Sequence, residues 1–280
     1  MPWHTTTDLD EFDAHAGDFL RARPTENTLL LTAMDYVKTQ GIHAYGNYDP
    51  MYGWWESPDA TVLGAYLCTP PYPVLVSSIA DDAVEPLVDI VATMGRVNAE
   101  RRLAEALAAQ WLARTGEPCE IVRQTRLFRL DELVPPVPAP PGLSRLAEPT
   151  DRELLVSWYA LFGEEVGEQH ANLSTVVDAR IEYGGLVLWQ DGGIPVCLAG
   201  RSQPLAGTIR VGPVFTPVEF RRRGYASALT ADISRRALDL ADEVVLFTDL
   251  ANPTSNAIYQ RLGYRPIEDR VWISITNAAG

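Results

Sequence analysis

Residues 208–229 read TIRVGPVFTPVEFRRRGYASAL and join a strand, a donor-rich loop and a helix. The apolar run Thr208–Phe215 has the composition of a strand. Gly212 and Pro213 interrupt it, which suits a β-bulge because proline cannot donate to a ladder. Apolar residues recur at helical spacing after the arginines and predict a helix over Gly224–Leu240. The segment therefore predicts a strand that leads through a tight turn into a helix.

The turn between this strand and this helix predicts an anion-binding site. Consecutive backbone N–H groups are exposed at a helix N-terminus, where the helix dipole adds partial positive charge. Gly224 lets the backbone come close to a ligand, and small Ala226 leaves room on the same turn. Guanidinium groups can add charge-assisted hydrogen bonds. The candidate residues are Arg221, Arg222, Arg223, Gly224, Tyr225, Ala226 and Ser227. A pyrophosphate suits them, although a helix start without a ligand has the same residues.

A second polar segment, NPTSNAIYQRLGY, covers residues 252–264 and predicts a helix over 252–262. Asn252 is a favourable N-cap, Pro253 suits the first helical position and Gly263 suits the exit. Asn252, Ser255, Asn256 and Tyr259 follow at i, i+3, i+4 and i+7, so they share one face. That face can line a cleft. Capping alone also explains Asn252, and packing alone also explains Tyr259.

Together these segments resemble the GNAT family of N-acetyltransferases. The run Arg221-x-x-Gly224-x-Ala226 after an apolar strand looks like the coenzyme A signature of that family. Asn252, followed seven residues later by Tyr259 and then by a glycine-aromatic pair, is similar to its last catalytic-region helix. Both occur in the family's order, and the resemblance covers about residues 143–275. It implies an N-acetyltransferase that uses acetyl-coenzyme A.

The resemblance also implies roles for individual residues. Backbone groups of Val214, Phe215 and Thr216 would bind the pantetheine arm, and an N–H there would polarise the thioester carbonyl. Tyr259 would protonate the departing thiolate, and Asn252 would contact the cofactor arm. The amine attacks directly in a ternary complex, so no covalent enzyme intermediate is implied.

The base that deprotonates the amine has no fixed position in the GNAT family. The chain after the first helix of a GNAT domain borders the acceptor site, which favours Glu164 or Glu165 as the catalytic base. Glu219, His170 and Asp249 are further candidates. The three glutamates could also be solvated surface groups, His170 could be exposed without a role, and Asp249 could equally have a structural role.

A proline-rich stretch divides the sequence near its middle. Residues 134–142 read VPPVPAPPG, which excludes helix and predicts a stiff linker. We expect two tandem GNAT-like domains of the α/β (α+β) class, residues 1–133 and 143–280. Each would have a mixed, mostly antiparallel sheet flanked by helices. Asp81 and Asp82 stand where the first half would bind a pyrophosphate, so we expect a degenerate copy that binds no cofactor.

Periodicity and turn residues predict the individual elements. Before the linker we expect helices over 8–21, 25–38, 82–94 and 98–114, and strands over 51–55, 61–68, 74–79 and 121–130. After it we expect helices over 151–162, 172–183, 224–240 and 252–262, and strands over 143–147, 186–190, 195–201, 208–215, 244–249 and 266–275.

Charge and composition limit the partners. The formal net charge of −14 argues against nucleic acid, attracts cationic substrates such as amines, and also fits a simple solubility role. Cys68, Cys119 and Cys197 are too few and too far apart for a disulfide framework or a zinc site. No long apolar run or signal peptide is present, so we expect no membrane contact and a cytoplasmic location.

The resemblance implies acetyl-coenzyme A as co-substrate and a small-molecule amine or an amino terminus as acceptor, and we expect no metal. Two alternatives stay open: a non-catalytic acyl-coenzyme A sensor, and an acyltransferase with a different donor. The sequence leaves the choice between monomer and homodimer open.

Overall fold

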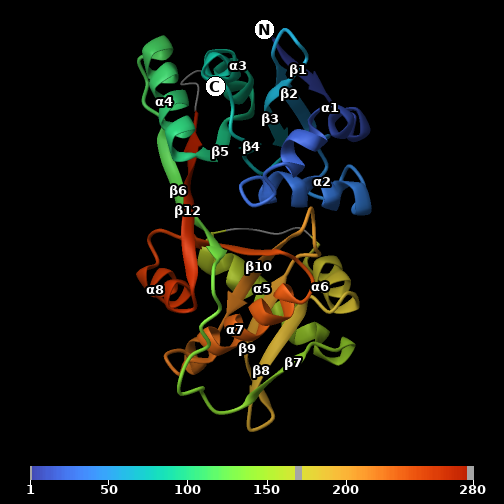
Figure 1. The fold of residues 1–280 in the computed structure, drawn as a ribbon, viewed down its shortest axis with the longest axis vertical. Coiled ribbons are helices and arrows are strands. Elements are labelled where there is room, and N and C mark those ends of the chain that lie inside the picture. The colour runs from blue at the N-terminus through green and yellow to red at the C-terminus, as the bar shows by residue number, and fades with distance from the viewer. Residues whose placement is uncertain (1, 168–171, 276–280) are drawn as a thin grey trace. The chain divides into compact units, whose positions relative to one another are not determined.

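The chain forms two compact units, and neither is a continuous stretch of sequence (Figure 1). The computed structural model describes residues 2–167 and 172–275. Unit 1 contains the chain up to Leu127, the short segment Asp249–Ala251 and the chain from Ile267 onward. Unit 2 contains Phe128–Thr248 and Asn252–Pro266.

Unit 1 is a mostly antiparallel sheet with strand order β1-β2-β3-β4-β5-β12. The pair β4 and β5 is parallel, and the other pairs in this order are antiparallel. Its elements are β1 (Trp3–Thr6), α1 (Leu9–Arg21), α2 (Thr28–Gln40), β2 (Met51–Glu56), β3 (Val62–Cys68), β4 (Val74–Val76), the 3-10 turn η1 (Asp81–Ala83), α3 (Val84–Met94), β5 (Arg96–Glu100), α4 (Arg101–Thr115), most of β6 (Glu120–Leu130) and most of β12 (Tyr264–Ser274).

Unit 2 has the strand order β6-β11-β10-β9-β8-β7. Strands β7 to β10 pair antiparallel, whereas β10 and β11 pair in parallel. Its further elements are β7 (Leu143–Leu146), η2 (Pro149–Asp151), α5 (Arg152–Val166), α6 (Leu173–Glu182), β8 (Leu186–Asp191), β9 (Ile194–Arg201), β10 (Thr208–Phe215), η3 (Val218–Phe220), α7 (Tyr225–Leu238), β11 (Glu243–Asp249) and α8 (Pro253–Arg261).

Apart from the additional 3-10 turn η2 of unit 2, the two units repeat one order of elements: a strand, two helices, three strands, a 3-10 turn, a helix, a strand, a helix and a last strand. The last strands are exchanged. Strand β12 pairs with β5 in unit 1, where Arg270 lies opposite Glu100, and β6 enters unit 2 at Phe128 (Figure 1). Residues 267–275 therefore pack in unit 1 and not with the rest of the expected domain 143–280.

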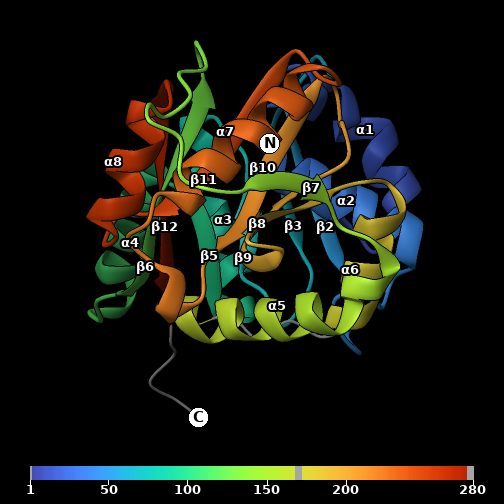
Figure 2. The same ribbon diagram turned by 90° about the horizontal axis from the view of Figure 1, so that it is seen from below.

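Each unit has helices on both faces of its sheet. In unit 1, Phe12 and Leu30 of α1 and α2 pack on one face, and Leu87 and Leu107 of α3 and α4 pack on the other. Unit 2 repeats this with α5 and α6 on one face and α7 on the opposite face of β8–β10 (Figure 2). These arrangements confirm the predicted α/β class with a mostly antiparallel sheet flanked by helices.

Two strands of unit 1 were missed by the sequence prediction. The stretch Asn98–Glu100 was placed in a helix over 98–114, but the chain forms β5 there and α4 begins at Arg101. No glycine or proline separates the two elements in the sequence. The boundary is instead formed by Glu100, whose side chain accepts hydrogen bonds from the N–H groups of Arg102 and Leu103 and so caps α4. Strand β1 is short and polar, and it carries no periodic signal.

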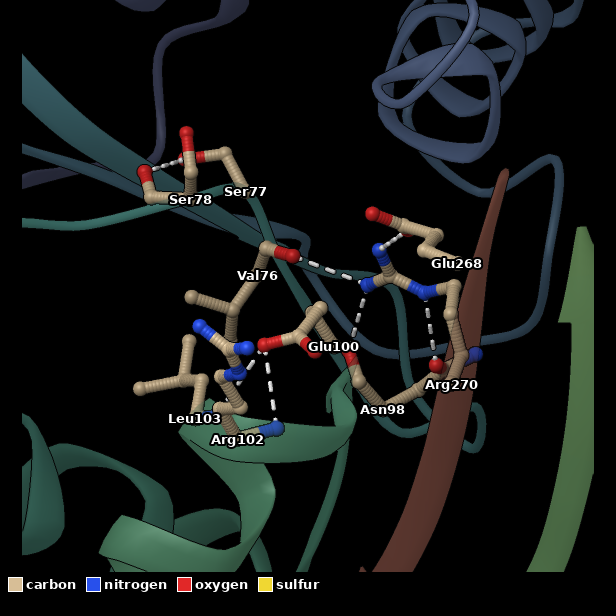
Figure 3. Close-up of polar contacts among 9 residues, drawn as sticks. All are labelled: Val76, Ser77, Ser78, Asn98, Glu100, Arg102, Leu103, Glu268 and Arg270. Carbon is tan, nitrogen blue, oxygen red and sulfur yellow. Dashed lines mark hydrogen bonds and ion pairs between the residues drawn. The ribbon is translucent and has the colours of Figure 1, made fainter.

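A buried arginine bridges β4 and β5 where these strands part (Figure 3). The last paired residues are Leu75 and Asn98. The Arg270 side chain, which is 2% exposed, donates to the carbonyl oxygens of Val76 (2.8 Å) and Asn98 (3.0 Å). It also bonds the side-chain oxygen of Asn98 at 3.0 Å and pairs with Glu268 at 2.9 Å. Burial raises the pKa of Glu268, so the guanidinium is what keeps this carboxylate compatible with the interior.

We predict that Arg270→Met lowers the free energy of unfolding by about 3–5 kcal/mol, because it leaves a buried carboxylate and two carbonyls without their donor. Urea denaturation at neutral pH measures this. Arg265→Met is the control on the same strand, since that side chain is 68% exposed and lies 3.6 Å from Asp131. Equal stability of the two variants would contradict a structural role for the cluster.

Candidate functional site

Strand β10 departs from its neighbour at a bulge. Its parallel pairing with β11 ends at Val211, opposite Leu246, although both strands continue. On the other edge, the register against β9 shifts between Val211 and Val214, where three steps along β10 match two along β9. This confirms the bulge that was predicted from Gly212 and Pro213. The backbone beyond Val211 has no ladder partner on β11.

The bulge also turns the side chains of β10 over. Ile209 and Val211 belong to the core beneath α7. Phe215 is four residues beyond Val211 and would face the same way in a regular strand, but it packs in the core beneath α5 and α6, with its ring 6.0 Å from that of Trp158. The end of β10 is thus anchored on the α5 and α6 side, away from its pairing with β11.

Free backbone donors line the turn before α7. Ala228 is the first residue of this helix whose N–H reaches a carbonyl, that of Gly224 at 3.1 Å. The six preceding amides, from Arg222 to Ser227, have no acceptor anywhere in the described parts of the chain. Arg222 and Gly224 have positive φ angles of 65° and 87°. The predicted anion-binding turn is therefore a run of unpaired donors at a helix N-terminus.

The three arginines of the turn differ in their contacts. Arg221 donates through Nε to the carbonyl oxygen of Thr216 at 2.8 Å and forms an ion pair with Glu165. Arg223 donates to the carbonyl oxygen of Glu219 at 3.1 Å. The exposed Arg222 has no hydrogen bond to any residue that the structure describes. Arg222 is thus the guanidinium most available to a ligand, whereas Arg221 holds the end of β10 in place.

Two contacts that the sequence did not predict fix the turn. The buried Tyr225 donates its hydroxyl to Asp191 at the end of β8, and this hydrogen bond raises the pKa of Tyr225. The proline-rich segment packs beside the turn. A Cβ atom added at Gly224 would lie 3.7 Å from the side chain of Pro140. The indole of Trp189 donates to the carbonyl of Pro141 at 2.9 Å and holds that segment. Nothing in the sequence pairs these residues.

Tyr259 is half-buried in the core beneath α7, and its ring lies 6.5 Å from that of Phe128. Its hydroxyl has no hydrogen-bond partner among residues 2–167 and 172–275. Burial raises the pKa of Tyr259 to about 12, with a smaller contribution from Cys197. Thr216, at the end of β10, donates its hydroxyl to the buried Cys197 thiol at 3.1 Å. The phenol is therefore protonated at neutral pH and free to donate.

Asn252 is the N-cap of α8, as predicted, because its side-chain oxygen accepts a hydrogen bond from Ser255 N–H at 3.0 Å. This contact occupies the oxygen and leaves the side-chain amide donors at an exposed position. A contact of Asn252 with a cofactor stays a prediction.

The candidate bases lie in different surroundings. Glu164 and Glu165 are exposed at the end of α5, and Glu165 pairs with Arg221. Glu219 is exposed in η3. Asp249 accepts from Ala251 N–H at 2.7 Å. His170 lies outside the described residues.

Other kinds of site were also considered. Within the described ranges, no group of three or more His, Cys, Asp and Glu side chains is placed to hold a metal ion. The three cysteines are free thiols. None of the helices in these ranges combines the length and the apolar character needed to cross a bilayer.

One family of known proteins matches part of the chain in sequence. The family described as FR47-like protein matches residues 199–273, a segment that contains β10, the amide turn and α8. No curated protein matches the chain in sequence.

Solved structures of GNAT-family acetyltransferases share the fold. One from Colwellia psychrerythraea has a TM-score of 0.64 at 9% identity and covers 99% of this chain and 100% of its own. A GCN5-related N-acetyltransferase from Sphaerobacter thermophilus has a TM-score of 0.64 at 14% identity, covering 98% and 96%. Another from Kribbella flavida has a TM-score of 0.57 at 18% identity, covering 79% and 89%. The fold is thus that of GNAT acetyltransferase structures over nearly the whole chain.

We predict that Gly224→Glu weakens the binding of coenzyme A at least about 100-fold, because a carboxylate would stand beside the free amides and repel a pyrophosphate. Isothermal titration measures this. Gly116→Glu is a matched control, since Gly116 also has a positive φ (76°), with open space around it, and lies in unit 1. Unchanged affinity in Gly224→Glu would show that the turn binds no phosphate.

Proposed function

We propose that this chain is an N-acetyltransferase that transfers an acetyl group from acetyl-coenzyme A to a primary amine of a small molecule or an amino terminus. One observation carries the proposal: six unpaired amides lie at the start of α7, in the connection that follows a strand parted from its parallel neighbour. Such a turn suits a pyrophosphate, and the parted strand edge suits an extended arm that needs backbone partners.

The residues present fit acetyl-coenzyme A. The amides of Arg222–Ser227 would receive the pyrophosphate, and the free guanidinium of Arg222 would add a charge-assisted contact. The β10 backbone at Val214, Phe215 and Thr216 would bind the pantetheine arm, since this stretch has no partner on β11. Arg221 and Tyr225 support these groups through Thr216 and Asp191.

Tyr259 would donate its proton to the departing thiolate. In water a phenol of pKa about 12 is a weaker acid than a thiol, so this transfer would be uphill. Burial, however, disfavours a thiolate in the same surroundings as much as it disfavours the phenolate. The transfer is therefore less unfavourable in the site, and a hydrogen bond from Tyr259 stabilises the sulfur as charge develops.

The amine would attack the thioester directly, after losing a proton to a carboxylate or to water. Glu164 suits this role better than Glu165, whose carboxylate would first have to leave Arg221. The acidic balance of the chain, −14, favours the approach of a cationic amine. Holding the amine and the thioester together then supplies much of the rate.

Unit 1 would be a second, inactive copy of the same fold. It repeats the element order of unit 2, but Arg270 bridges β4 and β5 at the point where they part, and Asp81 and Asp82 precede α3. Two carboxylates at a helix start repel a phosphate.

We therefore predict one acetyl-coenzyme A per chain in isothermal titration with the complete protein. Gly224→Glu should leave no measurable site, because the only functional turn is then blocked. Two binding events per chain in the wild type would show that unit 1 also binds the co-substrate.

We predict that Tyr259→Phe lowers kcat by roughly 10- to 1,000-fold while the dissociation constant of acetyl-coenzyme A changes by less than about threefold. Release of free thiol in the presence of a panel of small amines measures turnover. Tyr48→Phe is the control, because that side chain is 68% exposed. Wild-type protein that binds acetyl-coenzyme A but releases no thiol with any amine would favour the sensor over the enzyme.

A further inference from the structure

We propose that Arg180 is a positioning residue that holds the parted end of β10 in its open geometry, an inference that rests on the proposed function. Arg180 lies on α6 and donates through one nitrogen, Nη1, to the carbonyl oxygen of Gly212 at 2.7 Å. The same nitrogen bonds the hydroxyl of Tyr159 on α5 at 2.9 Å. The guanidinium also lies 5.7 Å from the centre of the Tyr159 ring.

The bonded carbonyl belongs to the first residue of β10 beyond its last pair with β11. Val211 is still paired with Leu246, and the bulge begins at Gly212. A carbonyl that leaves a ladder inside a protein needs another donor. Arg180 supplies it from the α5 and α6 side, so the contact stabilises the departure of β10 from β11.

The packing leaves a place for this contact. Gly200 of β9 lies where the three groups meet, because a Cβ added there would stand 2.7 Å from Arg180 Nη1, 3.0 Å from the Gly212 oxygen and 3.1 Å from the Tyr159 hydroxyl. Tyr159 is buried, and burial raises its pKa to about 12. Its hydroxyl thus stays neutral and accepts the hydrogen bond without adding a charge.

Unit 1 offers an internal comparison. Val76 is the first residue of β4 beyond the last pair with β5, so it takes the place of Gly212. Its carbonyl also accepts from a guanidinium, that of Arg270, but this group continues to Asn98 on β5 (Figure 3). Arg270 therefore ties the two strands together, whereas Arg180 ties β10 to a helix and leaves β11 out. The carbonyl at this position is therefore linked to the neighbouring strand in unit 1 and to a helix in unit 2.

This geometry assigns Arg180 an indirect part in acyl transfer. Val214 on β10 and Thr216 just after it, which would bind the pantetheine arm, follow Gly212 within four residues. Their backbone direction depends on the bulge. Loss of Arg180 should therefore misplace the thioester while the amide turn before α7 still binds the nucleotide end of coenzyme A.

The test compares Arg180→Ala with Arg152→Ala. Both variants lose a contact between α5 and α6, since Arg152 on α5 pairs with Asp178 on α6 at 2.6 Å, but only Arg180 reaches β10. We expect Arg180→Ala to lower kcat at least about 10-fold, with the dissociation constant of coenzyme A within about threefold of wild type. Arg152→Ala should keep kcat within about twofold of wild type.

Chemical rescue separates positioning from a general loss of structure. Guanidinium chloride at about 20 mM is far below denaturing concentrations. It should raise the kcat of Arg180→Ala at least about threefold and leave the kcat of wild type unchanged. Equal losses in the two variants, no loss in Arg180→Ala, or no rescue would each overturn the proposal.

Hydrogen exchange gives a readout that does not need activity. The amides of Gly212, Val214, Phe215 and Thr216 should exchange at least about 10-fold faster in Arg180→Ala than in wild type, while those of α7 stay unchanged. If wild-type protein releases no thiol with any amine, the proposed function fails, and this exchange result alone decides the positioning role. Unchanged exchange at 212–216 would overturn it.

Discussion

The structure depends on one requirement of backbone chemistry: where two parallel strands part, the groups that leave the ladder need other partners. In unit 2 the carbonyl of Gly212 accepts a hydrogen bond from the guanidinium of Arg180, whereas the amides before α7 find no acceptor in the described chain. In unit 1 the carbonyl of Val76 receives Arg270, which also binds across to β5. The carbonyls of Gly212 and Val76 are thus both satisfied, whereas in the described chain the amides of Arg222–Ser227 in unit 2 and of Asp81 and Asp82 in unit 1 have no acceptor. Arginines flank the free amides of unit 2 and aspartates carry those of unit 1, which is why we propose an anion-binding site in unit 2.

The three arginines of the turn are not equally available to a ligand. Three arginines in sequence suggest one large positive patch, but Arg221 is held by Thr216 and Glu165, and Arg223 bonds the carbonyl of Glu219. Backbone amides and Arg222 are then the principal donors available to a phosphate. Backbone amides do not ionise in the pH range of proteins, so their hydrogen-bond donors are present at any pH. They also have no side-chain rotamers, so a site built on them is preorganised. The overall acidity of the chain can therefore attract amines without weakening the turn.

The sequence predicted what depends on local signals. Gly212 and Pro213 marked the bulge, Asn252 and Pro253 marked the start of α8, and the arginine-glycine run marked the free amides before α7. Contacts between distant residues carried no such signal. In the sequence Arg180 belongs to a regular helical pattern and Gly200 to a strand, and neither position indicates a contact with Gly212. Asp191 fits a hairpin turn, and nothing in the sequence indicates its hydrogen bond with Tyr225. Strand β5 was missed because helices cover both faces of its sheet, so Val97, Asn98 and Ala99 are all buried and the alternation that identifies a half-exposed strand is lost.

The exchanged last strands explain why only one unit is bridged. Strands β6 and β12 are equally long, and the seventh residue of each is an arginine, Arg126 and Arg270. Arg270 lies in unit 1 and reaches β4. Arg126 also belongs to unit 1, and both of its hydrogen bonds go to the carboxylate of Asp269, the residue before Arg270. Because Asp269 holds Arg126, this guanidinium does not bridge the parted strands of unit 2, and the other two arginines of β6, Arg123 and Arg129, pair with side chains of β11. Strands β6 and β12 thus carry arginines at matching positions, and the carboxylate of Asp269 occupies the guanidinium of Arg126.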